Sequence, residues 1–296
     1  MSETEAPRPA FEDLPLKPPS ADNGLLAVFQ RRYLLRLLVK REIGARYQGS
    51  FLGMLWSYIN PMTQFFIYWF VFGVIFNAHK SVPNYAIHLF AGLVIVHFFT
   101  ESFQSGTQSI VRNKALVVKQ AMPREMFPVS AVLVSFYHVL PQMLILLVAC
   151  LLAGWTPDAV GMASLVLALA IIMCIGTACA LLFSAANVFF RDFGNIVNVF
   201  NHFVRYGVTM MFPWSYVQER LGDHAGLFLL NPLADAVLLF QRAFWVGTAS
   251  GEESKAVVMP DHLMLYGFAV LGASLVFLVI GQLVFSRLEN KIPERL

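Results

Sequence analysis

The sequence predicts an all-α integral membrane protein with six transmembrane helices, an N-terminal amphipathic interfacial helix and a re-entrant external helical hairpin. Of its 296 residues, 57% are hydrophobic and only 13% are charged, whereas soluble domains carry roughly 25% charged residues. Apolar runs of about 20 residues recur along the chain, and each is long enough to cross a hydrocarbon core of ~30 Å. A net charge of +3 is small for a nucleic-acid-binding protein, so we expect no nucleic-acid partner.

The N-terminal part divides into a tail and a helix. Residues 1–24 are rich in Pro and acidic side chains and lack the apolar core of a signal peptide, which predicts a disordered cytosolic tail. Residues 25–50 follow a helical pattern, with an apolar face and a basic face. A basic amphipathic helix of this kind lies in the plane of the lipid head groups. The alternative, a soluble partner-binding helix, is less favoured because a membrane segment follows at once. The apolar face holds Leu26, Phe29, Tyr33, Leu34, Leu37 and Leu38, and the basic face holds Arg32, Arg36 and Lys40.

Six apolar runs predict the membrane domain, residues 51–288, and a cytosolic tail follows at 289–296. The runs are residues 53–77, 85–110, 127–152, 159–188, 196–217 and 262–286. Of the 21 Lys and Arg residues, 16 fall on the side of the N-terminus, four on the opposite side and one, Arg205, inside a run. Because cytoplasmic loops carry an excess of Lys and Arg, we expect both termini in the cytoplasm.

Two connections between the runs have unusual patterns. The cytoplasmic connection 111–128 mixes four basic residues with the apolar patch Leu116–Val118 and two prolines. It reads as a solvated loop or as a short helix that docks on a cytoplasmic partner. The external connection 219–261 contains two apolar halves around Asn231-Pro232, each too short to cross the membrane. This pattern predicts a re-entrant hairpin whose broken backbone is covered by protein or lines a cavity.

Polar residues inside the runs mark candidate functional faces, because polar groups in a membrane are costly. The second run carries His97, Glu101, Gln104 and Gln108 on one helical face, and the fifth carries Asn198, His202, Arg205 and Thr209. Such faces form either interhelical hydrogen bonds or the wall of a wet pathway for an anionic or hydroxyl-rich substrate. Both interpretations stay open, although an Arg near mid-membrane favours a function for Arg205.

The first run carries a stripe of aromatic residues. The pattern favours packing or lipid contact, although aromatic faces can also stack on sugar rings. The stripe consists of Phe65, Trp69, Phe72 and Phe76.

Motifs for catalysis are missing from the sequence. It contains no G-x-x-x-x-G-K-[ST] phosphate loop, no H-E-x-x-H and no G-x-S-x-G. The three cysteines lie apart in apolar runs, and the external acidic residues are not arranged as an acid/base pair. We therefore expect no cofactor, no metal and no catalysis by this chain. A membrane-embedded glycosyl- or acyltransferase and a non-transporting scaffold are the disfavoured alternatives.

Three motifs give the chain a family resemblance. They are KREIGARYQGSFLGMLWSYINP at residues 40–61, ANVFFRDFGNIV within 185–197, and Asn231-Pro232. Over roughly residues 30–290 the chain resembles ABC-2 type permeases that export polysaccharide, in particular the O-antigen, teichoic acid and galactan exporters. The opening motif is the most specific of the three, and Asn231-Pro232 alone is weak.

The resemblance implies a permease subunit in a bacterial cytoplasmic (inner) membrane, surrounded by membrane lipids. Two copies would pair with two nucleotide-binding ATPase subunits, which hold ATP and Mg, and the substrate would be a lipid-linked (polyprenyl-diphosphate) glycan such as O-antigen or galactan. A capsule or teichoic acid exporter, or an ABC-2 exporter of small lipids or drugs, is the alternative.

The resemblance also implies roles for individual residues. The diphosphate head group would enter at Arg41, Arg46 and Arg112. The channel would be lined by Tyr58, Phe65, Trp69, Phe72, Phe76, Asn198, His202, Arg205 and Thr209. Coupling to the ATPase would use Leu116, Val117, Val118, Met122, Arg191 and Asp192.

Overall fold

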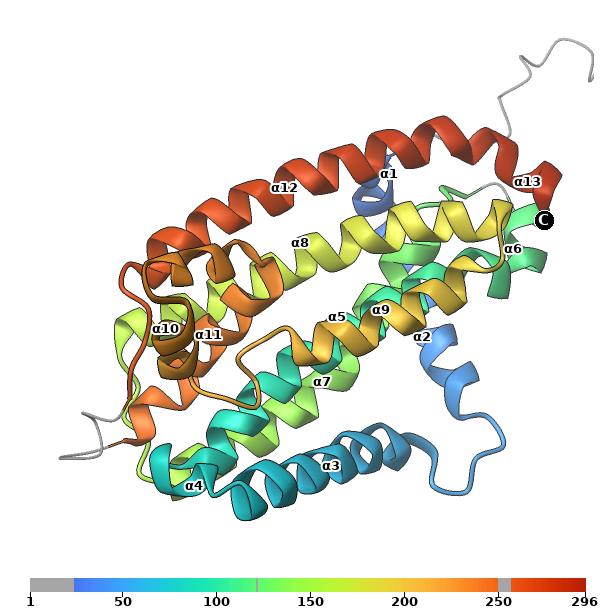
Figure 1. The fold of residues 1–296 in the computed structure, drawn as a ribbon. Helices are drawn as coiled ribbons and strands as arrows, with labels where there is room; N and C mark the ends of the chain where they lie inside the picture. Colours follow the sequence, from blue (N-terminus) through green and yellow to red (C-terminus); the bar gives the residue numbers. More distant parts are fainter. Residues whose placement is uncertain (1–23, 121, 250–256) are drawn as a thin grey trace, which may run out of the picture.

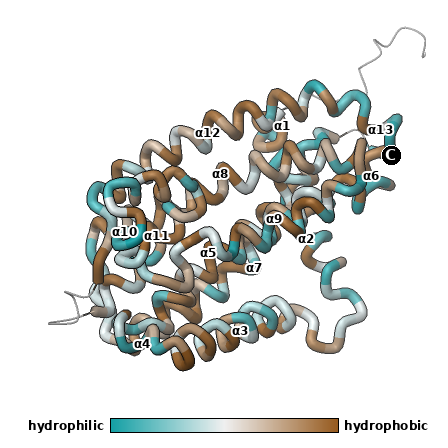
Figure 2. The backbone as a smooth tube through the Cα atoms, in the orientation of Figure 1, coloured by the Kyte–Doolittle hydropathy of each residue, from teal (hydrophilic) through white to brown (hydrophobic). Residues whose placement is uncertain are grey.

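In the computed structural model, residues 24–120, 122–249 and 257–296 are described, so the tail predicted for residues 1–24 lies outside them except for Gly24. All regular elements in these ranges are helical, as predicted (Figure 1). Five are long and apolar enough to cross a membrane: Gly53–Ile75, Tyr85–Arg112 (α5), Met126–Leu152 (α7), Ala159–Phe189 (α8) and Leu263–Lys291, which consists mainly of α12 (Leu263–Leu288). In Figure 2, hydrophobic residues, drawn in brown, recur along these helices.

The long helix α5 forms the centre of the bundle. Within its most apolar stretch 83% of the residues are buried, against 11% for Gly53–Ile75. It packs against α7, α8, α9 (Phe193–Tyr206) and α11 (Pro232–Phe244), and α8 also packs along α12. The first membrane segment, formed by η2 (Gly53–Leu55), α3 (Trp56–Tyr68) and η3 (Trp69–Ile75), touches the bundle along one side only.

Alternate connections gather at opposite ends of the bundle (Figure 1). One end, called the α6 end, holds α6 (Lys114–Lys119), the α8–α9 turn and α13 (Ile292–Arg295), which follows η7 (Glu289–Lys291). The other, the α10 end, holds α4 (Ala78–Ser81), the α7–α8 turn and α10 (Trp214–Leu221). This alternation agrees with the predicted order of loops, whereas the direction of the bundle in the membrane stays a prediction.

The predicted amphipathic helix consists of two pieces, α1 (Leu25–Gln30) and α2 (Arg32–Tyr47), broken at Arg31. One side packs on the α6 end through Val28, Leu35 and Leu38, which join the buried cluster around Val117 and Phe127. A second set of apolar side chains is exposed: Leu26, Phe29, Tyr33 and Leu37. Such a bare apolar strip beside basic residues suits contact with a lipid surface.

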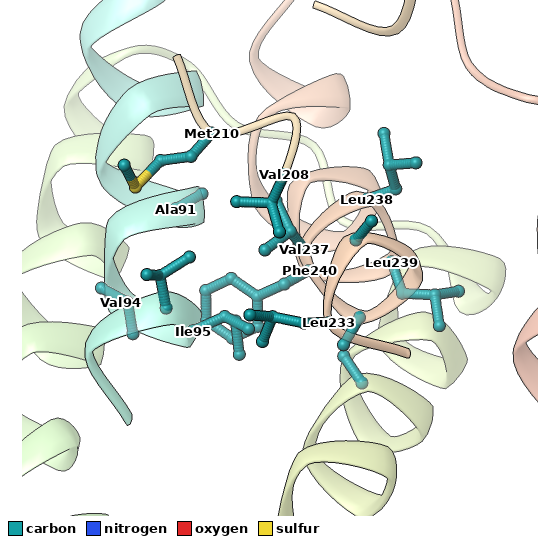
Figure 3. Close-up of a cluster of buried hydrophobic side chains, with 14 of the residues drawn as sticks. Ala91, Val94, Ile95, Val208, Met210, Leu233, Val237, Leu238, Leu239 and Phe240 are labelled. Atoms are coloured by element: carbon teal, nitrogen blue, oxygen red, sulfur yellow. The ribbon is translucent and has the colours of Figure 1, made fainter. Parts of the chain in front are cut away.

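The fifth predicted run, 196–217, is wrong in its extent. The helix α9 ends at Tyr206 after 14 residues, about 21 Å at 1.5 Å per residue. The following segment is unwound and buried, with Val208 and Met210 lying against α5 and α11 (Figure 3). At Gly92 of α5, an added Cβ would lie 2.9 Å from Met210 Cα, so the close approach requires glycine.

Side chains from α5 and from the start and middle of α11 donate hydrogen bonds to the backbone carbonyls of the unwound segment. Tyr85 donates its hydroxyl to the Met211 carbonyl at 2.8 Å, and Gln241 Nε2 donates to the Thr209 carbonyl at 2.9 Å. Asn231 Nδ2 donates to the Gly207 carbonyl at 3.3 Å. Buried carbonyls that lose their helical partners need such donors, which explains why the break is tolerated.

The predicted re-entrant hairpin is confirmed as a bent helix pair. Trp214–Leu230, which comprises α10 and η4 (Gly222–Leu230), meets Pro232–Thr248, α11 and η5 (Val246–Thr248), at 100°. Asn231 sits at the bend, where its Oδ1 accepts from Leu233 N at 3.1 Å and caps α11. The far end of α11 is held by Arg242, which donates to both Asp158 carboxylate oxygens, at 3.0 and 2.6 Å. These bonds lower the pKa of the Asp158 carboxyl.

The contact between α5 and α8 provides a packing test. A Cβ added at Gly106 would overlap the Ala180 Cβ and lie 3.0 Å from the Ala180 Cα. We expect Gly106→Ala to cost about 1–3 kcal/mol and to lower the thermal unfolding midpoint in detergent. Gly272→Ala is the control, since Gly272 has no atom within 4 Å of an added Cβ. Equal midpoints for the two variants would contradict this account of the packing.

Candidate functional site

Three neighbouring cavities follow one another along α5 and share lining residues, and together they are called the polar path. The first, about 230 Å³, is lined by Arg46, Ser105 and Arg112 among others. The second, about 260 Å³, lies against Arg46, Glu101 and His97 and is completed by Tyr47, Ser50, Trp56, Ser57, Asn60, Pro61 and His138. The third, about 190 Å³, again includes His97 and Glu101 and is completed by Thr100, Gln104, Asn198, Asn201, His202 and Arg205. Arg46 therefore joins the first two cavities, and His97 with Glu101 joins the last two.

An ion pair stands where the first two cavities meet. Arg46 Nη2 lies 2.7 Å from Glu101 Oε1, so the end of α2 is tied to the middle of α5. Ser105 Oγ donates to the same carboxylate oxygen at 2.9 Å. Residues four apart share a helix face, which is why His97, Glu101 and Ser105 line one side of α5.

Hydrogen bonds from α3 and α7 complete the second cavity. The Tyr47 hydroxyl lies 3.1 Å from His138 Nδ1 and also contacts the Ser57 hydroxyl. Gln142 Nε2 lies 3.1 Å from His97 Nδ1. The path is therefore built from side chains of α2, α3, α5 and α7, which lie far apart in the sequence.

The helix α9, which corresponds to the fifth predicted run, supplies one wall of the third cavity. Asn198, His202 and Arg205 all line it, as expected for one helical face. Thr209 does not, because it lies buried in the unwound segment after α9. Asn201 ties α9 to α5 by donating from Nδ2 to the Thr100 carbonyl at 3.3 Å.

The aromatic stripe of the first membrane segment lies outside the polar path. Phe65 packs edge-on against Phe90 of α5, with ring centroids 5.2 Å apart, and Phe72 stacks on Phe76 at 5.8 Å. Trp69 and Phe76 are exposed, and Tyr58 is half-buried. None of these five residues lines the three cavities, so their expected place in a channel stays a prediction.

The three predicted head-group residues differ in their surroundings. Arg46 and Arg112 line the first cavity, and Arg112 also donates to Gln108 Oε1 at 3.1 Å. Arg41 lines none of the three cavities and donates from Nη1 to Asn113 Oδ1 at 3.0 Å. That bond ties α2 to the residue that starts α6.

The residues expected to contact an ATPase lie together at the α6 end (Figure 1). In α6, Val117 is 5% exposed and anchors the helix, whereas Val118 is 55% exposed. Leu116 and Met122 are partly buried against the same cluster. Arg191 and Asp192 are exposed in the turn between α8 and α9.

Several residues that line the polar path, or that bond to its lining, were not predicted from the sequence. Tyr47, Ser57, His138 and Gln142 were not singled out, although His138 and Gln142 are polar residues four apart in an apolar run, the pattern used for α5. Within the described ranges, no group of three His, Cys, Asp or Glu side chains lies close enough to hold a metal ion.

Comparison with known proteins gives concordant matches. Residues 33–215 match the family described as ABC-2 type transporter. The O-antigen export system permease protein RfbA of Klebsiella pneumoniae is 27% identical over 267 residues, 88% of this chain and 94% of the relative. The protein of the same name from Myxococcus xanthus is 30% identical over 221 residues, 74% of this chain and 82% of the relative.

Proposed function

Since the chain belongs to the ABC-2 type transporter family, we propose that it is the permease of an exporter that moves a lipid-linked polysaccharide, such as O-antigen, across the cytoplasmic membrane. Membership makes it the membrane subunit of a transporter, which works with a nucleotide-binding partner. The observation that carries the proposed substrate is the similarity to O-antigen export permeases over 88% of the chain. The polar path supports it, because hydroxyl-rich glycans need hydrogen-bonding walls.

The proposed assembly has two copies of this chain and two ATPase subunits that hold ATP and Mg. The bare side of the first membrane segment and the exposed residues of α9, such as Phe203 at 72% exposure, would face the second copy across a channel. Both termini would be cytoplasmic, with the α6 end towards the ATPase. The exposed Val118 and the Arg191-Asp192 turn would receive its motion on ATP binding.

The proposed transport begins at the first cavity. A polyprenyl-diphosphate head would arrive between Arg41 and Arg112 and be held by Arg46, since guanidinium groups bind phosphate oxygens in a bidentate manner. Movement of α6 would shift the two permease chains and open the channel. The sugar chain would then pass Arg205, His202 and the aromatic side chains of the first membrane segment.

A second candidate substrate is a small apolar lipid or drug. An apolar cavity of about 500 Å³ favours it, because its wall is formed by hydrophobic side chains of α5, α8 and α9, including Phe99, Phe103, Phe183, Phe200 and Phe203. Pockets of this volume and character suit small molecules.

Reconstitution distinguishes the two candidates. The chain and its ATPase partner are placed in proteoliposomes with a purified lipid-linked glycan or with a small fluorescent lipid. We expect ATP-dependent appearance of the glycan on the far side, detected by a lectin that cannot cross the bilayer. A variant of the partner that cannot hydrolyse ATP is the control. Transport of the small lipid without transport of the glycan would contradict the proposed substrate.

A further inference from the structure

Most of the residues that line the second cavity carry hydrogen-bond donors, and Pro61 and the aromatic ring of Trp56 complete its wall. The Arg46 guanidinium, the Tyr47 and Ser57 hydroxyls, the Asn60 amide and the His138 ring all border it. Among the described residues of this lining, Glu101 is the one carboxylate. A volume of about 260 Å³ exceeds the share of several waters, at about 30 Å³ each, so a compact anion fits.

Glu101 occupies the position that such an anion would take. Its Oε1 lies 2.7 Å from Arg46 Nη2, the spacing of a charge-assisted hydrogen bond. Ser105 supplies a second donor at 2.9 Å. Arg46 remains 39% exposed and also reaches the first cavity, so an anion arriving there meets the same guanidinium from its open side.

We propose that the second cavity is a phosphate-type anion site in which Glu101 is the internal counter-ion, and that a diphosphate displaces Glu101 from Arg46. A diphosphate carries more charge than a carboxylate and offers more acceptor oxygens to the Arg fork and the neighbouring hydroxyls. The displaced carboxylate gives up its bonds to Arg46 and Ser105 and still borders the third cavity, where Arg205 is the next cation. Binding of an anion in the second cavity thereby changes the charge that faces the third cavity.

The inference rests on the proposed function in one respect, that the anion is the head group of the substrate. Its chemistry is tested without glycan and without ATP. The full chain in phosphatidylcholine nanodiscs is titrated calorimetrically with inorganic pyrophosphate, and in a second arm with farnesyl diphosphate. Binding in both arms means that the free diphosphate suffices, and binding of farnesyl diphosphate alone means that the site requires a lipid-borne head group. Binding in neither arm would overturn the inference.

Two substitutions should act in opposite directions. We expect Glu101→Gln to tighten diphosphate binding about tenfold, because it removes the competing charge, and Arg46→Gln to weaken it at least about tenfold. Glu219→Gln is the matched control, since Glu219 is exposed on α10 and lines none of the three cavities, and its affinity should match that of the unaltered chain. If the ion pair served only to hold the fold, both path variants would weaken binding together, and that result would overturn the proposal.

A milder variant keeps the proposal testable if the charge-changing variants do not fold. Ser105→Ala removes one bond to Glu101 without changing any charge, so it should tighten binding by about two- to threefold, in line with one modest hydrogen bond. Unchanged or weaker binding in a folded Ser105→Ala chain would count against the proposal. Failure to bind diphosphate in a chain that still exports glycan would overturn this inference alone, whereas intact binding without glycan export would overturn the proposed substrate alone.

Discussion

Arg205→Glu is expected to abolish glycan export while the partner subunit still hydrolyses ATP. Arg205 lines the third cavity together with Glu101, and the substitution would place a second carboxylate in that cavity. Two like charges at 4 Å repel by about 4 kcal/mol at an effective dielectric constant of 20, which is enough to reduce passage of a diphosphate by roughly a thousandfold. Export is measured in the reconstituted system with the lectin, and ATP hydrolysis by phosphate release.

Two further variants define what Arg205 does. Arg205→Lys keeps the positive charge but loses the planar guanidinium, so we expect it to retain a large part of the export rate if charge is what matters. Arg220→Glu makes the same charge reversal at an exposed position of α10, outside the three cavities, and should export normally. Normal export with normal ATP hydrolysis in Arg205→Glu would remove Arg205 from the mechanism.

The architecture was largely predictable because long apolar runs permit few structures in a membrane. Within the described residues, five of the six predicted runs became helices of spanning length, and the bend at Asn231 follows from a Pro between two short apolar halves. The end of α9 was not predictable in this way. Val208, Met210 and Met211 continue the apolar run, and the unwound backbone is tolerated there because Tyr85, Asn231 and Gln241, distant in sequence, supply donors to its carbonyls.

The residues of the polar path were likewise predictable only in part. The faces of α5 and α9 could be derived from four-residue spacing, since that spacing is a property of one helix. The partners from other elements could not, because the Arg46–Glu101 ion pair and the Tyr47–His138 hydrogen bond depend on how α2 and α7 pack against α5. The predicted place of Thr209 on the polar face of α9 is wrong for the same reason, because it assumed that the helix continues past Tyr206.

Val118→Asp is expected to weaken binding of the chain to its ATPase subunit and to abolish export. Val118 is 55% exposed at the α6 end, next to Val117, which anchors α6 in the buried cluster. A carboxylate at the exposed position leaves the fold intact but would be desolvated in an interface with the partner, a loss of at least about 2 kcal/mol for a well-packed contact. We expect the purified chain to keep its melting midpoint, to bind the ATPase subunit at least about 30-fold more weakly, and to lose export.

The matched control makes the same substitution at the opposite end. Val258 is 37% exposed just before α12, so Val258→Asp should leave both ATPase binding and export unchanged. Val117→Asp is the contrasting case, because it would bury a carboxylate and lower the melting midpoint itself. Normal ATPase binding and normal export in a folded Val118→Asp chain would show that α6 does not receive the ATPase. The Arg191-Asp192 turn would then be the remaining candidate at this end, to be tested by Asp192→Lys in the same binding measurement.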